Sequence, residues 1–109
     1  MSKKNEPFEQ LNDESSLDQF IANHNICFVE VYSSTWDRCQ ALVSTARRWK
    51  AQYLSNGVVF GLIEASAASK LGPVGAAPRF FLFHKGSLVS DFTGLNIPLL
   101  QSSIEQLFV

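Results

Sequence analysis

Two cysteine side chains, Cys27 and Cys39, are the clearest candidates for chemistry in this chain of 109 residues. Thiol–disulfide exchange needs one thiolate that attacks and a second thiol nearby that resolves the mixed disulfide. The apolar stretch from Ile26 to Tyr32 lies between the two cysteines and has the composition of a strand. Such a strand would hold them about 15–20 Å apart, whereas a disulfide needs Cα atoms within about 7 Å. We therefore expect no bridge between them, and we expect Cys27 to be a small buried apolar residue.

The composition is that of one ordinary globular domain. The chain is 46% apolar and 17% charged, which suits a packed core and leaves no length for a second domain. Residues 1–7 are polar, so we expect a flexible segment there and a single domain over residues 8–109. The net charge of −1 gives no electrostatic footprint for nucleic acid or an anionic membrane. His24 and His84 stand apart from each other and from the cysteines, so we expect no metal and no cofactor.

The start of the chain carries two lysines with no apolar stretch behind them, unlike a secretory signal. The longest apolar run, residues 26–32, is interrupted by Glu30 and is too short to cross a bilayer. We therefore expect a cytoplasmic protein whose cysteines stay reduced.

Five segments have the apolar, β-branched and aromatic content of strands. They are residues 8–11, 26–32, 58–63, 79–83 and 88–92. The second is apolar on both faces, so we expect helices to cover both sides of it. Lys85 and Gly86 predict a tight turn, which would make the last two strands an antiparallel hairpin.

Helical spacing and capping residues predict four helices between and after these strands. The first follows a cap at Asn12 or Asp13, the second runs from near Trp36 to about Leu54, the third covers residues 65–71, and the fourth follows Asn96. In the fourth, Pro98 suits the first turn, and Leu99, Leu100, Ile104 and Leu107 are expected to face the core. The resulting order, β-α-β-α-β-α-β-β-α, predicts an α/β domain with helices flanking a central mixed sheet.

This order resembles the thioredoxin family over nearly the whole chain. The segment Phe28 to Tyr32 is similar to the central strand of that family. Thr35-Trp36-Asp37-Arg38-Cys39 stands where the family has Trp-Cys-Gly-Pro-Cys, and Ala76-Ala77-Pro78-Arg79 stands where it has a segment with a cis-proline. Phe83 to Gly86 and Thr93-Gly94 match its hairpin turn and final glycine. The resemblance implies the thioredoxin fold.

The resemblance also implies that the exchange chemistry is incomplete. Trp36 replaces the first cysteine and has no nucleophilic atom, while Cys39 keeps the position of the resolving thiol. Two interpretations of Cys39 remain: a monothiol that forms mixed disulfides or senses oxidants, and a packing residue at the first turn of a helix. Glu30 stands where the family places a buried aspartate that moves a proton to or from the resolving thiol. It could keep that role or simply point to an exposed edge.

The groove beside the active loop could still bind a peptide after the exchange chemistry is lost. In resembling proteins the backbone next to the cis-proline pairs with an extended peptide. Trp36, Asp37, Arg38, Ala77 and Pro78 are therefore candidate binding residues, with Trp36 either docking a partner or folding over the loop. Asp37 and Arg38 are either a charged rim or solvated residues at the helix start.

The segment from Gly94 to Gln101 resembles a Gly-x-Asn-x-Pro-x-Leu segment in thioredoxin-like light chains of axonemal outer-arm dynein, and Ile63-Glu64-Ala65 resembles a strand end in that group. Those proteins usually keep both cysteines. The resemblance implies a non-catalytic subunit in the axoneme of a cilium or flagellum, with a dynein intermediate or heavy chain as partner. The alternatives are an attenuated monothiol oxidoreductase that uses Cys39, and a redox-inactive domain of another assembly, such as a splicing factor.

Overall fold

The computed structural model describes residues 7–33, 40–71 and 78–108. Their elements, with η for short 3₁₀ turns, are β1 (Glu9–Leu11), α1 (Glu14–Asn23), β2 (Ile26–Tyr32), α2 (Gln40–Gln52), η2 (Leu54–Asn56), β3 (Val58–Glu64), η3 (Ala65–Ala67), η4 (Ser69–Leu71), β4 (Arg79–His84), β5 (Ser87–Thr93) and α3 (Ile97–Glu105). All five predicted strands are confirmed, the central one with the expected bounds.

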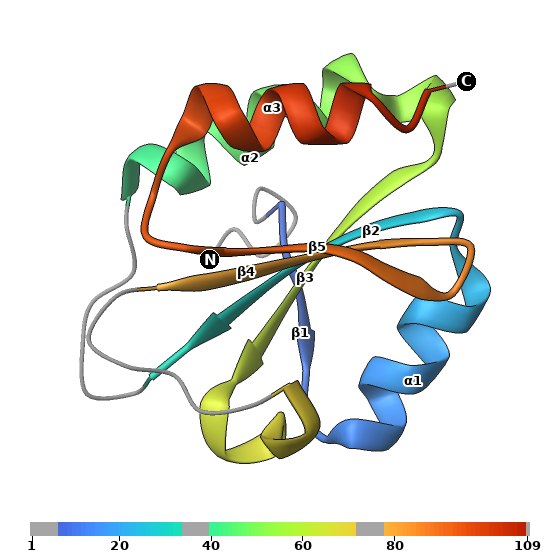
Figure 1. Cartoon of the computed structure of the whole chain (residues 1–109), viewed down its shortest axis with the longest axis vertical. Helices are drawn as coiled ribbons and strands as arrows, with labels where there is room; N and C mark the ends of the chain where they lie inside the picture. The colour runs from blue at the N-terminus through green and yellow to red at the C-terminus, as the bar shows by residue number, and fades with distance from the viewer. Residues whose placement is uncertain (1–6, 34–39, 72–77, 109) are drawn as a thin grey trace, which may run out of the picture.

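One sheet organises the chain, with strands in the order β1-β3-β2-β4-β5. Strands β1, β3 and β2 run parallel to one another, and β4 is antiparallel to both β2 and β5, which makes the sheet mixed. Helices α2 and α3 cover one face and α1 covers the other (Figure 1). This is the predicted α/β arrangement.

The alternating side chains of β2 supply both cores. Phe28 enters the core beneath α2 and α3, where its ring lies 6.2 Å from Trp49 and 5.7 Å from Phe80. Val29, one residue on, enters the core beneath α1 together with Leu17. Because β2 is flanked by β3 and β4, both of its backbone edges are paired as well.

The predicted caps and turn are confirmed. Asp13 accepts a hydrogen bond from the Ser16 amide at 2.8 Å and begins α1, and Asn96 accepts one from the Leu99 amide at 3.1 Å and begins α3. At the β4–β5 turn, Lys85 and Gly86 both have positive φ, 53° and 84°, as a two-residue hairpin with right-handed strand twist requires.

Residues 65–71 differ from the prediction, because they form the two 3₁₀ turns η3 and η4 in place of one helix. Between them Ala68 leaves the helical backbone region, with φ −124° and ψ 38°. Its side chain is fully buried in the core beneath α1. The predicted continuous helix does not form, because the backbone changes direction at Ala68 and places its side chain in the core.

Leu99 also differs from the prediction, because its side chain is 49% exposed. Leu100 and Ile104 do face the core, as expected. Successive helical residues point about 100° apart, and in α3 it is Leu100, with Ile104 one turn on, that faces the core. Helix α2 ends at Gln52, slightly before the predicted end, and its predicted start near Trp36 lies outside the described residues.

Gly61 lies in β3 beside the side chains of Phe20 in α1 and Leu11 in β1. A Cβ atom on it would lie 2.9 Å from Cε2 of Phe20 and 3.0 Å from Cδ1 of Leu11. We expect Gly61→Ala to lower the free energy of unfolding by about 1–3 kcal/mol, because the ring and the leucine must shift within a packed core. Urea unfolding measures this. The matched control Ser44→Ala, on the exposed side of α2, should change it by less than about 0.5 kcal/mol.

Candidate functional site

Three segments that are distant in sequence meet at one end of the sheet. Because β2 and β4 are antiparallel, with Val31 opposite Arg79, the end of β2 lies beside the start of β4. The end of β5 joins them, since Thr93 lies opposite Arg79 and the Gly94 amide donates a hydrogen bond to the Pro78 carbonyl at 2.8 Å. The chain enters residues 34–39 from this point (Figure 1). The fold therefore brings Pro78 and the beginning of the candidate loop together.

Glu30 lies in β2 two residues before the strand ends at Tyr32. It pairs with Leu62 of β3 and Phe80 of β4, and only 2% of it is exposed. It is two residues from Phe28 on the same strand, so it points to the face that α2 and α3 cover. The exposed-edge interpretation of Glu30 is therefore wrong. Its predicted part in proton transfer stays a prediction.

The other candidate residues differ in how much the structure describes. Pro78 is half-buried and directly precedes β4. Trp36, Asp37, Arg38, Cys39 and Ala77 lie outside the described residues. The expected cis peptide bond belongs with them, because it joins Ala77 to Pro78.

Cys27 is separated from this end of the sheet both by its position along β2 and by the face to which it points. It lies near the start of β2, and it points to the face that α1 covers, opposite to Glu30. Its side chain is fully buried, and its Sγ donates to the Phe20 carbonyl at 3.6 Å. Burial raises the pKa of the Cys27 thiol from 9.0 to about 11. The prediction that Cys27 is a small buried residue is confirmed.

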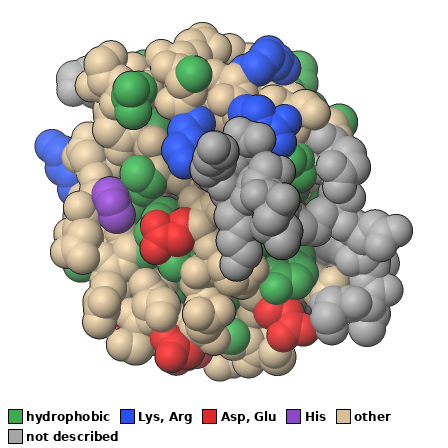
Figure 2. All heavy atoms as spheres, turned by 180° about the vertical axis from the view of Figure 1, so that it is seen from behind, with side chains coloured by type: hydrophobic (Ala, Val, Ile, Leu, Met, Phe, Trp, Pro, Cys, Tyr) green, Lys and Arg blue, Asp and Glu red, His purple; other side chains and the backbone are tan. Residues whose placement is uncertain are grey.

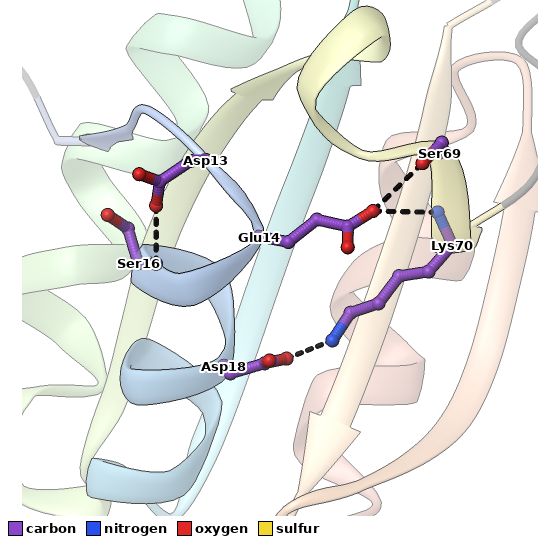
Figure 3. Close-up of polar contacts among 6 residues, drawn as sticks. All are labelled: Asp13, Glu14, Ser16, Asp18, Ser69 and Lys70. Atoms are coloured by element: carbon purple, nitrogen blue, oxygen red, sulfur yellow. Dashed lines mark hydrogen bonds and ion pairs between the residues drawn. The ribbon is translucent and has the colours of Figure 1, made fainter.

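The connection from β3 toward Pro78 is fastened to α1 by polar contacts that the sequence analysis did not identify (Figure 3). Glu14 accepts hydrogen bonds from the Ser69 hydroxyl at 2.9 Å and from the Lys70 amide at 3.3 Å. Lys70 also forms an ion pair with Asp18. The partners are more than 50 residues apart in sequence, so no local pattern could indicate them. Each contact is exposed and contributes little alone, but together they fix where this connection starts.

A second contact that sequence reasoning missed joins α2 to α3. The Tyr53 hydroxyl donates to Oε2 of Glu105 at 2.5 Å, and the Phe108 ring lies 5.0 Å from the Tyr53 ring. Burial, followed by this hydrogen bond, raises the pKa of Tyr53 to about 12. The contact joins the residue that follows α2 to the last residue of α3.

No group of three or more His, Cys, Asp or Glu side chains is placed to hold a metal ion among residues 7–33, 40–71 and 78–108. Within the same ranges, no helix combines the length and apolar character needed to span a bilayer.

The burial of Cys27 predicts a loss of stability at high pH. The unfolded chain releases the thiol proton near pH 9, whereas the folded chain holds it until about pH 11. Deprotonation therefore favours the unfolded state, and the free energy of unfolding should fall as the pH rises through this window. Urea unfolding between about pH 8 and pH 10 measures the slope. Cys27→Ala should flatten it, and an unchanged slope in that variant would contradict the assignment.

Comparison with solved structures gives thioredoxins of low sequence identity. A thioredoxin of Fasciola hepatica is 20% identical, with a TM-score of 0.76 over 91% of this chain and 98% of that one. Oxidised mitochondrial thioredoxin 3 of Saccharomyces cerevisiae is 19% identical, with a TM-score of 0.76 over 91% and 94%. A Plasmodium falciparum thioredoxin is 18% identical, with a TM-score of 0.73 over 90% and 97%. Neither protein-family models nor curated proteins match the chain. The chain therefore has the thioredoxin fold.

Proposed function

We propose that this chain works by binding a protein partner at the end of the sheet where β2, Pro78 and Gly94 meet, without dithiol exchange. The observation that carries the proposal is Trp36, which stands four residues after β2 ends, where the resemblance places the attacking cysteine. An indole cannot attack a disulfide, and Cys27 lies on the other face of the sheet.

The backbone contacts around Pro78 support the binding proposal. The start of β4 is held beside β2 by the sheet and beside Gly94 by the bond to the Pro78 carbonyl. Pro78 remains partly accessible. A rigid support that is close in sequence to an aromatic residue is a favourable basis for a protein contact.

A light chain of axonemal outer-arm dynein is the most specific form of this proposal. It rests on the resemblance of the segment from Gly94 to Gln101. The structure gives part of that segment a local role, since Asn96 caps α3 and Pro98 lies in its first turn. The solved structures of the same fold named above are thioredoxins. We therefore keep a protein partner as the main proposal, with a dynein chain in the cytoplasm or axoneme as one identity to test.

An attenuated oxidoreductase that uses Cys39 is the second candidate. The similarity in fold to thioredoxins favours it. Buried Glu30, on the face that α2 covers, also favours it, because a carboxylate there could accept or return a thiol proton. In this case Cys39 would form mixed disulfides with partner thiols, and Cys39→Ser would abolish them.

Replacing Trp36 tests whether only one thiol is missing. We expect the unchanged chain to be inactive in insulin reduction with dithiothreitol, and Trp36→Cys to raise the rate about tenfold or more over the uncatalysed reaction. In each turnover the two thiols would become a disulfide as one insulin disulfide becomes two thiols, and dithiothreitol would restore the thiols. Turbidity of the released insulin chains measures the rate. Adding Cys39→Ser to Trp36→Cys should abolish the gain, and activity of the unchanged chain would contradict the main proposal.

Partner capture tests the binding proposal directly. A tagged chain isolated from its native cells should retain a protein partner through a high-salt wash, because an aromatic docking contact is not screened by salt. Trp36→Ala should reduce retention about tenfold or more. The control Gln19→Ala, exposed on α1, should leave it unchanged. A free monomer, or retention that is insensitive to Trp36→Ala, would overturn the proposal.

A further inference from the structure

The first turn of α3 exposes apolar side chains to solvent. Leu95, Pro98 and Leu99 are all exposed, and Leu99 is 49% exposed although its sequence position predicted a place in the core. The side of the helix that faces the core is occupied by Leu100 and Ile104. Helix α3 therefore begins with apolar side chains on two sides, one packed on the sheet and one in solvent. We define Leu95, Pro98 and Leu99 as the Leu99 patch.

Helix capping accounts for the place of Leu95 but not for that of Leu99. The Asn96 side chain accepts a hydrogen bond from the Leu99 amide at 3.1 Å, so Asn96 is the N-cap. Leu95 precedes the cap and Leu100 is the fourth residue after it, and apolar residues at these two positions often pack together at a helix start. Leu99 is the third residue after the cap, where glutamate or glutamine assists capping. A leucine at that position has no part in capping.

The Leu99 patch lies at the end of the sheet where the partner is proposed to bind. The Gly94 amide donates to the Pro78 carbonyl at 2.8 Å, and Leu95 is the next residue of the chain. Leu99 lies three residues after the N-cap, about 4.5 Å along the helix axis. The chain passes from the end of β5 into α3 on the side of the sheet where β4 begins (Figure 1). Pro78 and the Leu99 patch therefore lie at the same end of the molecule.

The chain around the Leu99 patch carries no charge. Residues 92–104 include no Asp, Glu, Lys or Arg. Arg79 and Asp91, on the adjoining strand ends, share the face of Phe81, because Arg79 is two residues from Phe81 and Asp91 pairs with it. That face is the one that α1 covers, and α3 lies over the opposite face.

Charged side chains gather on another side of the molecule. Helix α3 lies in front of α2 in Figure 1, and the view from behind shows Lys and Arg in the upper part of the surface and acidic side chains below (Figure 2). A charged partner residue buried against the Leu99 patch would lose its hydration and find no counter-ion among residues 92–104. The patch therefore suits an apolar contact.

We propose that the partner bound at Pro78 covers the Leu99 patch with an uncharged, apolar segment, and that Leu99 is the main anchor of this contact. The proposal rests on the proposed function, because it names the chemistry of the partner at that same site. Continuity with Pro78 through Gly94 favours this occupant over a second copy of the chain. Burial of the exposed half of a leucine contributes affinity through the hydrophobic effect, which salt does not screen.

A titration of the isotope-labelled full chain tests the proposal with a defined probe. The probe is a synthetic peptide of about nine residues with blocked ends, in which Leu or Val alternates with Ser or Thr. In the control peptide, Glu replaces the central Leu and Val residues. Amide shifts should concentrate at residues 94–99, and added salt should leave the affinity unchanged. The control peptide should bind about tenfold more weakly, because its carboxylates would be desolvated.

Two substitutions of Leu99 separate binding from folding. Leu99→Gln should weaken binding of the uncharged peptide about fivefold, and Leu99→Glu about tenfold. Leu99→Glu should keep or raise the midpoint of urea unfolding, because an acidic residue here assists capping and suits the helix dipole. Leu88→Gln is the matched control, because Leu88 is also 49% exposed but lies five residues before Thr93 on β5, about 15 Å away. It should leave the affinity within about twofold.

Equal binding of the two peptides, shifts away from residues 94–99, or an affinity that is insensitive to Leu99→Gln would overturn the proposal. The same shifts on concentrating the chain without peptide would overturn it too, since they would assign the patch to contact between two copies. A captured partner that is lost with Trp36→Ala but kept with Leu99→Gln would refute the role of Leu99 and leave the proposed function standing. Peptide binding that depends on Leu99, with capture insensitive to Trp36→Ala, would refute the proposed function and leave the apolar contact standing.

Discussion

The structure depends on the burial of β2 on both faces and both edges. Its peptide groups are paired with β3 and β4, and its side chains alternate between two cores. A strand enclosed in this way cannot shift by one residue without moving every apolar side chain to the wrong face. The same constraint fixes Glu30, which must lie on the face of Phe28 whatever its polarity. The depth of this carboxylate is therefore set by register.

The end of β2 is the place where this rigidity would support the proposed binding site. The strands converge there, and backbone hydrogen bonds hold Pro78 beside Gly94. Helices α2 and α3, joined by Tyr53 and Glu105, lie over the same face. A surface built on such support can change its loop residues without changing the fold. The framework of a thioredoxin fold can therefore persist where the residues that follow β2 differ.

Sequence reasoning predicted what depends on local pattern. The apolar run of β2, the caps Asp13 and Asn96 and the Lys85-Gly86 turn each carry their own signal, and each is found where expected. It did not predict what depends on packing between distant segments. Ala68 is drawn into the core and interrupts a helix, and Glu14 holds a turn 55 residues away.

Because Cys27 is buried, its thiol can be modified only in chains that are unfolded or opened. Its sulfur lies against the Phe20 carbonyl in a core with no exposed surface at that side chain. Oxidants and alkylating agents can reach it only while the chain is open, during synthesis or after damage. An oxygen or adduct added then would have no space on refolding, because this interior is closely packed. Modified Cys27 would therefore mark the molecules that have once been unfolded and keep them from returning to the native population.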